Sequence, residues 1–200
     1  DREAARQELL LAKERAVTPL LAALTEPDLA DARYQVVDVL LSLMMRVEDR
    51  RIGDRLRRLL VDDPAPEVRA RIARGFGMQG RAEGAESLIA ALDDAASAVR
   101  FQALLALNSL DDKLADEQRD RAQLKALALA YDDDSEVRME ARIRLAGVVD
   151  HWLDAARTAE LEADLVGAQA LYEKARAVFP PSKAANHRLG RFHYDNGRIE

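Results

Sequence analysis

The sequence has no cysteine, few aromatic residues (4%) and no long apolar run. Without cysteine, these 200 residues can hold no disulfide, thiolate nucleophile, Cys-ligated zinc or covalently attached haem. No apolar run approaches the roughly 18 residues of a membrane span, and we find no signal peptide. Because the chain opens at Asp1 rather than Met, an upstream signal or anchor could have been cut away. The compartment stays open between cytoplasm and periplasm.

The charge balance disfavours nucleic acid as a partner. The formal net charge is -6 and the pI is about 5.3, so the surface repels a phosphate backbone unless arginine gathers on one face. With 48% hydrophobic and 33% charged residues, the chain can bury a core, and its scarcity of aromatic residues favours helix throughout.

A fourfold internal repeat predicts the fold. An arginine follows a small or apolar residue at the head of four helical segments: Arg33, Arg69, Arg100 and Arg138. Apolar positions recur three and seven residues later: Val36 and Leu40, Ile72 and Phe76, Ala103 and Leu107, Ala141 and Leu145. A helix pair of this size cannot bury its own apolar stripe and must stack on neighbours. We therefore predict an all-α fold, an α-solenoid of antiparallel helix pairs.

Proline, glycine and aspartate divide the chain into these pairs. Residues 1–15 form a remnant or capping helix. The helices predicted after it, in pairs, are 17–26 with 33–45, 51–61 with 66–76, 82–92 with 97–108, and about 115–131 with 135–147. The short polar turns between them imply antiparallel neighbours.

The repeat resembles a known family. An aspartate stands six residues before three of the arginines: Asp63, Asp94 and Asp132. An apolar helix, then Asp, then Val-Arg, then an Ala/Leu-rich helix looks like HEAT repeats of the shorter bacterial kind, over about residues 17–147. The arginines are 36, 31 and 38 residues apart, shorter than the family's about 40 to 47. The resemblance implies that each Asp pairs with its own Arg or a neighbouring one, forming a ladder along the stack.

Beyond Gly147 the period changes to one that resembles tetratricopeptide repeats (about 149–200). The first repeat carries Trp152, Ala155, Ala156, Ala159, Ala168, Tyr172, Ala175 and Pro180. A second begins 34 residues later, with Asn186, Leu189, Gly190 and His193. We thus predict two domains, 1–147 and 148–200, the latter being one full repeat plus the first helix of a second.

The tetratricopeptide resemblance implies close helix packing, an uncovered face on the last helix and a chain that continues further. Small residues (Ala156, Ala168 and Gly190) let the helices approach closely. The apolar face of the last helix, with Leu189 and Phe192, should be uncovered, which would make this chain a fragment of a longer protein.

The tetratricopeptide resemblance also implies a peptide site on the first helices of these repeats. Its residues are Leu153, Arg157, Glu160, His187, Arg188 and Arg191. The family's dicarboxylate clamp has Lys and Asn where this chain has Leu153 and Arg157, and a second Asn where it has Arg188. We therefore do not expect a chaperone-tail receptor, and hypothesise an acidic peptide held by Arg157, Arg188 and Arg191.

Other patterns receive structural interpretations. The GxGxxG string at residues 75–80 follows a helix rather than a strand, so we interpret its glycines as ending that helix. Carboxylate clusters at the turns cap helices. The arginines between residues 46 and 58 alternate with acids, as on a solvated helix rim with i,i+4 pairs. The three histidines have no metal-site spacing. We predict no catalytic residue, no cofactor and no metal.

Three functions stay in competition. The first is a non-enzymatic scaffold that presents curved helical surfaces to a protein or peptide. The alternative is a docking or regulatory repeat segment of a larger multidomain bacterial enzyme, such as a multihaem cytochrome. A bilin-lyase-like enzyme rests on fold resemblance alone. The sequence does not specify an oligomeric state.

Overall fold

The computed structural model describes residues 12, 15–26 and 32–197, and every regular element within them is a helix. Residues 15–23 are helical. The elements that follow are α2 (Arg33–Met44), α3 (Arg50–Asp62), α4 (Pro66–Met78), η2 (Ala82–Gly84), α5 (Ala85–Ala91), α6 (Ser97–Ser109), η3 (Asp111–Lys113), α7 (Asp116–Leu129), α8 (Ser135–Leu161), α9 (Leu165–Val178) and α10 (Lys183–Asp195). The all-α prediction is confirmed. The capping helix predicted over residues 1–15 lies almost entirely outside the described residues.

The chain forms two compact units, Asp1–Lys125 and Ala126–Glu200. The domain boundary predicted between residues 147 and 148 falls inside α8, and the helix predicted to end at residue 147 continues to Leu161. Gly147 does not stop it, because a single glycine inside a helix costs only about 1 kcal/mol relative to alanine. The predicted boundary between the HEAT-like and tetratricopeptide parts therefore lies within a continuous helix, and the division into these two parts stays a prediction.

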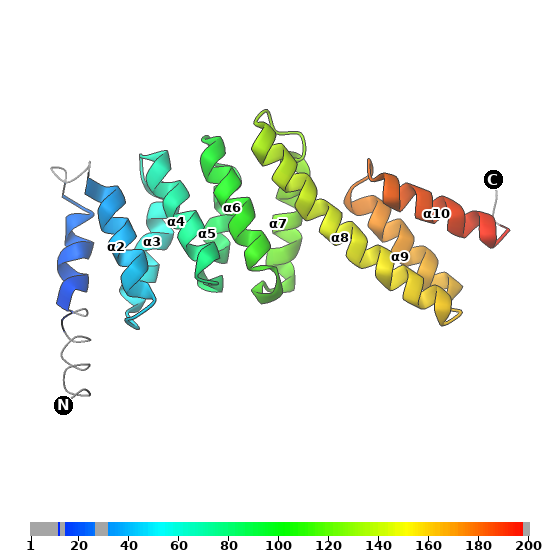
Figure 1. Cartoon of the computed structure of the whole chain (residues 1–200), viewed down its shortest axis with the longest axis horizontal. Helices are drawn as coiled ribbons and strands as arrows, with labels where there is room; N and C mark the ends of the chain where they lie inside the picture. Colours follow the sequence, from blue (N-terminus) through cyan, green and yellow to red (C-terminus); the bar gives the residue numbers. More distant parts are fainter. Residues whose placement is uncertain (1–11, 13–14, 27–31, 198–200) are drawn as a thin grey trace. The chain divides into compact units, whose positions relative to one another are not determined.

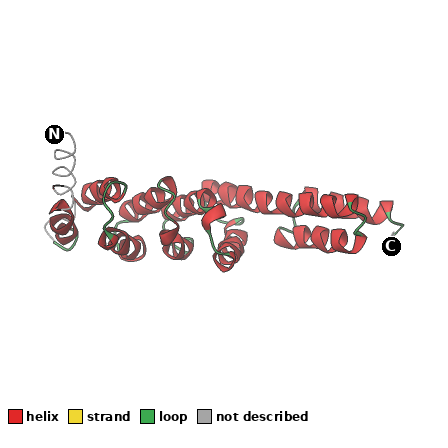
Figure 2. Ribbon diagram, turned by 90° about the horizontal axis from the view of Figure 1, so that it is seen from below, coloured by secondary structure: helices red, strands yellow, loops and turns green. Residues whose placement is uncertain are grey.

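The first unit is a stack of helix pairs. In Figure 1, α2, α4 and α6 lie in front of α3 and α5, and Figure 2 shows the two layers from the side. The predicted inward positions are fully buried in α2, α4 and α6: Leu40, Ile72, Phe76, Ala103 and Leu107. One differs, because Val36 is half-buried and the next residue, Val37, is fully buried instead.

Two glycines of the GxGxxG string lie inside α4 rather than at its end, which corrects the interpretation given above. A Cβ on Gly75 would lie 2.4 Å from Leu41 Cδ2, and one on Gly77 would lie 2.7 Å from the Ala106 Cα. These glycines therefore allow α4 to approach α2 on one side and α6 on the other. Only Gly80, with φ +62°, serves the turn. No strand precedes the string in the described residues, so it lacks the strand–turn–helix context of a dinucleotide fingerprint.

In the second unit, α8 and α9 form an antiparallel hairpin whose turn has Ala163 in the left-handed region (φ 61°). The Asp164 carboxylate caps α9 by accepting the Gly167 N–H at 2.9 Å. Ala156 and Ala168 are both fully buried, as expected for closely packed helices.

The last helix does not have the bare apolar face that the sequence led us to expect. Leu189 is 5% and Phe192 is 2% exposed. The reason is that α10 packs on α9, where the rings of Phe192 and Tyr172 lie 5.4 Å apart. Gly190 is exposed, and a Cβ there would meet no atom within 4 Å, so it is not needed for close approach.

The glycine contacts yield a first prediction. Gly77→Ala should destabilise the chain by about 1–3 kcal/mol, because the added methyl meets the backbone of α6. Gly53→Ala, within α3, should stabilise it by about 0.5–1 kcal/mol, because no atom lies closer than 3.9 Å to the new Cβ and alanine favours helix. Urea unfolding followed by circular dichroism measures both. Equal effects of the two substitutions would contradict the packing.

Candidate interaction surfaces

A repeated aspartate joins consecutive helix pairs of the first unit. Asp94 accepts the Ala96 N–H at 2.9 Å and binds Arg69 through both carboxylate oxygens, to Nε and Nη2, at 2.7 Å each. Its backbone carbonyl accepts a hydrogen bond from Arg100 Nη1 at 2.8 Å. One residue thus caps its own turn, holds the arginine of the preceding pair and anchors the arginine of its own pair.

The preceding turn uses the same arrangement. Asp63 is 3% exposed, accepts the Ala65 N–H at 2.9 Å and lies 3.4 Å from Arg33 Nε. Its carbonyl accepts from Arg69 Nη1, so Arg69 spans two turns. The ladder predicted from the family resemblance is confirmed for the pairs Arg33–Asp63 and Arg69–Asp94.

The electrostatics of the ladder favour its charged form. Burial acts to raise the pKa of Asp94, but the hydrogen bonds from Arg69 and Ala96 and the charges of Arg69 and Arg100 hold that pKa below its usual value. The hydrogen bond to Asp94 raises the pKa of Arg69 in turn. Both groups are therefore ionised at neutral pH, and the ladder fixes the register of the helices that it joins.

Each ladder arginine lies near the start of its helix, and positions counted from it are equivalent in α2, α4 and α6. Some of these positions form a face that points away from the core. Residues one, five and nine positions after each arginine lie on one side of the helix, opposite the inward positions. On α2, α4 and α6 they are Tyr34, Asp38, Ser42, Ala70, Arg74, Met78, Phe101, Leu105 and Ser109, and none is fully buried. We call this set the α2–α4–α6 face.

The α2–α4–α6 face carries apolar side chains and a cation. Tyr34 is 41% and Met78 is 73% exposed, and Phe101 and Leu105 are half-buried. Arg74 is exposed and makes no ion pair with the described residues.

A neighbouring arginine is already neutralised. Arg71 Nε donates to Asp38 Oδ1 at 2.8 Å and links α4 to α2. The α2–α4–α6 face therefore combines exposed apolar area with one uncompensated positive charge, at Arg74.

The second unit holds the six residues that the sequence assigned to a peptide site. Leu153 is 8% exposed and belongs to the packing of α8 rather than to an open surface. The others lie on α8 or α10: Arg157, His187, Arg188 and Arg191 are exposed, and Glu160 is half-buried. Arg191 Nε lies 3.4 Å from Asp195 on its own helix.

A tyrosine lies between two of these arginines. The Tyr172 hydroxyl donates to Glu160 Oε2 at 2.7 Å. Burial, together with that hydrogen bond and the charge of Glu160, raises the pKa of Tyr172 to about 12, although Arg188 and Arg157 act to lower it. Glu160 thus contacts Tyr172, and Arg157 and Arg188 lie close enough for their charges to act on it. Neither arginine forms an ion pair with a described residue.

The remaining sequence candidates behave as structural features. Arg51 pairs with Asp49 and Arg57 with Asp54, so the rim pairs are two and three residues apart rather than four. Among the described residues, no group of three His, Asp or Glu side chains could hold a metal ion. No helix in the described part of the chain is both long and apolar enough to cross a bilayer.

Sequence reasoning missed the α2–α4–α6 face. The signal was present, because the repeated arginine that set the inward positions also sets the outward ones. Tyr34, Phe101 and Leu105 are apolar at outward positions, which helical spacing alone could have revealed.

Stacked helix pairs, an aspartate–arginine ladder and open helix faces define a helical repeat protein. Residues 53–146 match the family model of HEAT repeats. This match confirms the HEAT resemblance over that segment, and HEAT repeats usually serve as protein-interaction scaffolds. No curated protein matches the chain.

The ladder yields a second prediction. Arg69→Met should cost about 3 kcal/mol of unfolding free energy, because it leaves the carboxylate of Asp94, 9% exposed, without its partner. Arg57→Met should cost less than about 1 kcal/mol, because its partner Asp54 is half exposed to solvent. Urea unfolding at pH 7 measures both free energies.

The same pair predicts a pH dependence. Because the pKa of Asp94 is lowered on folding, its stabilisation is fully present above the unfolded value of about 4 and is lost as pH falls through the folded value. The difference between wild type and Arg69→Met should therefore narrow on going from pH 7 to pH 3. A constant difference across this range would show that the pair is not electrostatically coupled.

Proposed function

We propose that this chain is a non-enzymatic protein-interaction scaffold whose first unit binds its partner on the α2–α4–α6 face. The observation that carries the proposal is a face that holds exposed and half-buried apolar side chains together with the unpaired Arg74. The ladder supports it, because helices held in fixed register present that face without reordering on binding.

The chemistry of the face defines the partner. Met78, Phe101 and Leu105 favour apolar side chains, and Arg74 favours a carboxylate. An amphipathic segment with an acidic residue beside its apolar stripe satisfies both. Such a partner could equally be another domain of a larger multidomain protein, in which this chain acts as the docking segment.

For residues 148–200 we propose tetratricopeptide-like packing and a second binding face for an acidic peptide. Buried small residues at Ala156, Ala168 and Ala175 support the packing. Arg157 on α8 and Arg188 on α10, which approach the same tyrosine, support the binding face. Of the six residues assigned from the sequence, we leave Leu153 out of the proposed peptide contacts because it is buried.

The α2–α4–α6 face can be tested by exchanging exposed residues only. The double variant Arg74→Glu, Met78→Asp should lose a partner captured by the wild-type chain from an extract of the source organism, because it reverses the charge and removes the apolar contact. The control is Arg58→Glu, Val61→Asp on α3, in the other layer, where both side chains are also exposed. Quantitative mass spectrometry compares the captures. Retention of every partner by the first variant would exclude this face.

The second face can be tested with a defined probe. We expect an end-blocked peptide of alternating Glu and Ala to bind the chain about tenfold more weakly after Arg157→Gln, Arg188→Gln, because each arginine supplies charge-assisted hydrogen bonds. Arg176→Gln on α9 is the matched control, an exposed arginine outside the group. Fluorescence anisotropy measures the dissociation constants. Unchanged affinity in the double variant would remove the proposal for this face.

A further inference from the structure

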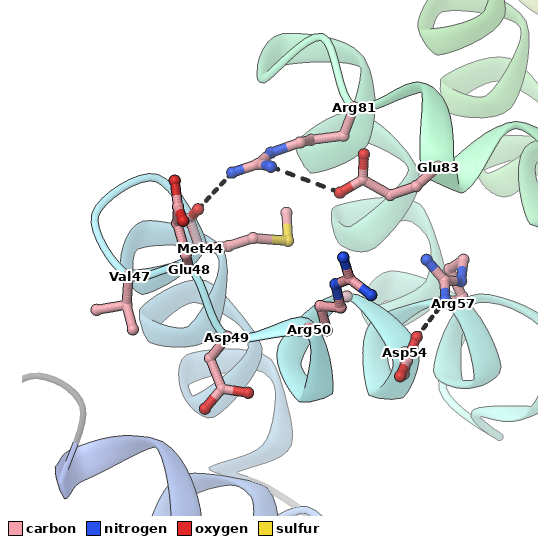
Figure 3. A pocket seen from close by; sticks show the side chains of 10 residues that line it. Met44, Val47, Glu48, Asp49, Arg50, Asp54, Arg57, Arg81 and Glu83 are labelled. Atoms are coloured by element: carbon pink, nitrogen blue, oxygen red, sulfur yellow. Dashed lines mark hydrogen bonds and ion pairs between the residues drawn. The ribbon is translucent and has the colours of Figure 1, made fainter.

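A cavity of about 660 Å³ opens beside the turn between α2 and α3. Figure 3 shows that side chains from this turn, from α3 and from the segment between α4 and α5 border it. Met44 is its apolar part, and its charged side chains include Arg50, Arg57, Arg81 and Glu83. All of its residues belong to the first unit, and none belongs to the α2–α4–α6 face.

Two of the three arginines that line the cavity are committed to neighbours. Arg81 donates to the Met44 carbonyl, and its Nη1 lies 3.5 Å from Glu83 Oε1. Arg57 pairs with Asp54. These contacts hold the cavity walls in place and commit both arginines to groups of the protein itself.

Arg50 is different, because it makes no ion pair with any described residue. In Figure 3 its guanidinium points into the space bordered by Met44 and Glu83, whereas Val47 and Asp49 point away from that space. An arginine that points into an open cavity and has no ion-pair partner of its own is suited to a planar oxyanion, which it can bind through two parallel hydrogen bonds.

The acids of the cavity narrow the choice of ligand. Glu48, Asp54 and Glu83 also line it, so a polyphosphate would be repelled, whereas a single carboxylate finds its partner in Arg50. The acids accept hydrogen bonds, which backbone amides of a peptide donate and a simple carboxylate ion does not. The cavity volume is in the range typical of small-ligand sites, which suits a short segment.

We propose that this cavity binds an acidic side chain carried by an extended peptide segment of a partner. The carboxylate pairs with Arg50, the neighbouring amides donate to Glu83 and Glu48, and an adjacent apolar side chain covers Met44. The inference rests on the proposed function, since it assumes a protein partner, but it uses residues that the α2–α4–α6 face does not share.

The experiment uses the whole 200-residue chain carrying Arg157→Gln and Arg188→Gln, so that the second unit does not compete for the probe. The probe is acetyl-Ala-Ala-Glu-Ala-Ala-amide, titrated while the arginine Nε–Hε signals are followed by NMR. The Arg50 signal should shift and saturate. The matching Gln peptide and acetate alone should each bind about tenfold more weakly, because one lacks the charge and the other lacks the amides.

Substitutions locate the site. Arg50→Gln should weaken binding of the Glu peptide about tenfold, and Arg58→Gln, an exposed arginine on the same helix outside the cavity, should leave it unchanged. Equal binding of acetate and the Glu peptide would reduce the cavity to a simple anion site and overturn the peptide assignment. Tighter binding of a Lys peptide, or no effect of Arg50→Gln, would overturn the proposal altogether.

This test is independent of the test of the α2–α4–α6 face. Binding of the Glu peptide at Arg50 while the Arg74→Glu, Met78→Asp variant keeps all its partners would exclude the α2–α4–α6 face and leave the cavity site standing. If the Arg74→Glu, Met78→Asp variant loses its partners but the Glu peptide does not bind at Arg50, only the cavity site would be refuted.

Discussion

The first unit depends on the aspartates at the turns within the α3–α4 and α5–α6 pairs. A buried carboxylate is costly unless hydrogen bonds and an opposite charge compensate it. Asp94 accepts hydrogen bonds from the Ala96 N–H and from Arg69, and Asp63 accepts one from the Ala65 N–H and forms an ion pair with Arg33. Because Arg69 also binds the carbonyl of its own turn, at Asp63, neighbouring pairs can stack only in one register. Burial of leucines drives the stacking, and the ladder decides its alignment.

Fixed register has two consequences for function. It brings the outward positions of α2, α4 and α6 onto one face, which carries Tyr34, Arg74 and Phe101 although they are distant in sequence. It also places the segment after α4 beside the turn after α2, where Arg81 reaches the Met44 carbonyl and one wall of the cavity forms. Both surfaces follow from stacking rather than from any local motif.

Glycine allows the close packing on which this register depends. Gly75 and Gly77 spell part of a nucleotide-binding string, yet they lie within a helix and face Leu41 and Ala106 of the neighbouring helices. Glycine in a helix is unfavourable locally, so its presence at two such positions reflects contacts from outside the helix. Sequence spacing could argue against a nucleotide site, but it could not show that these glycines contact neighbouring helices.

The sequence alone determined the helical class and the inward positions such as Ile72 and Leu107, because helical periodicity is a local property. The aspartate–arginine pairs were implied only by the resemblance to HEAT repeats, and the structure shows which residues pair. Tertiary structure alone decided that α8 runs through Gly147, that Phe192 is covered by Tyr172, and that the charges of Arg157 and Arg188 both act on one tyrosine. Those features depend on how helices distant in sequence pack against each other, and helical periodicity within one segment carries no information about the partner that covers it.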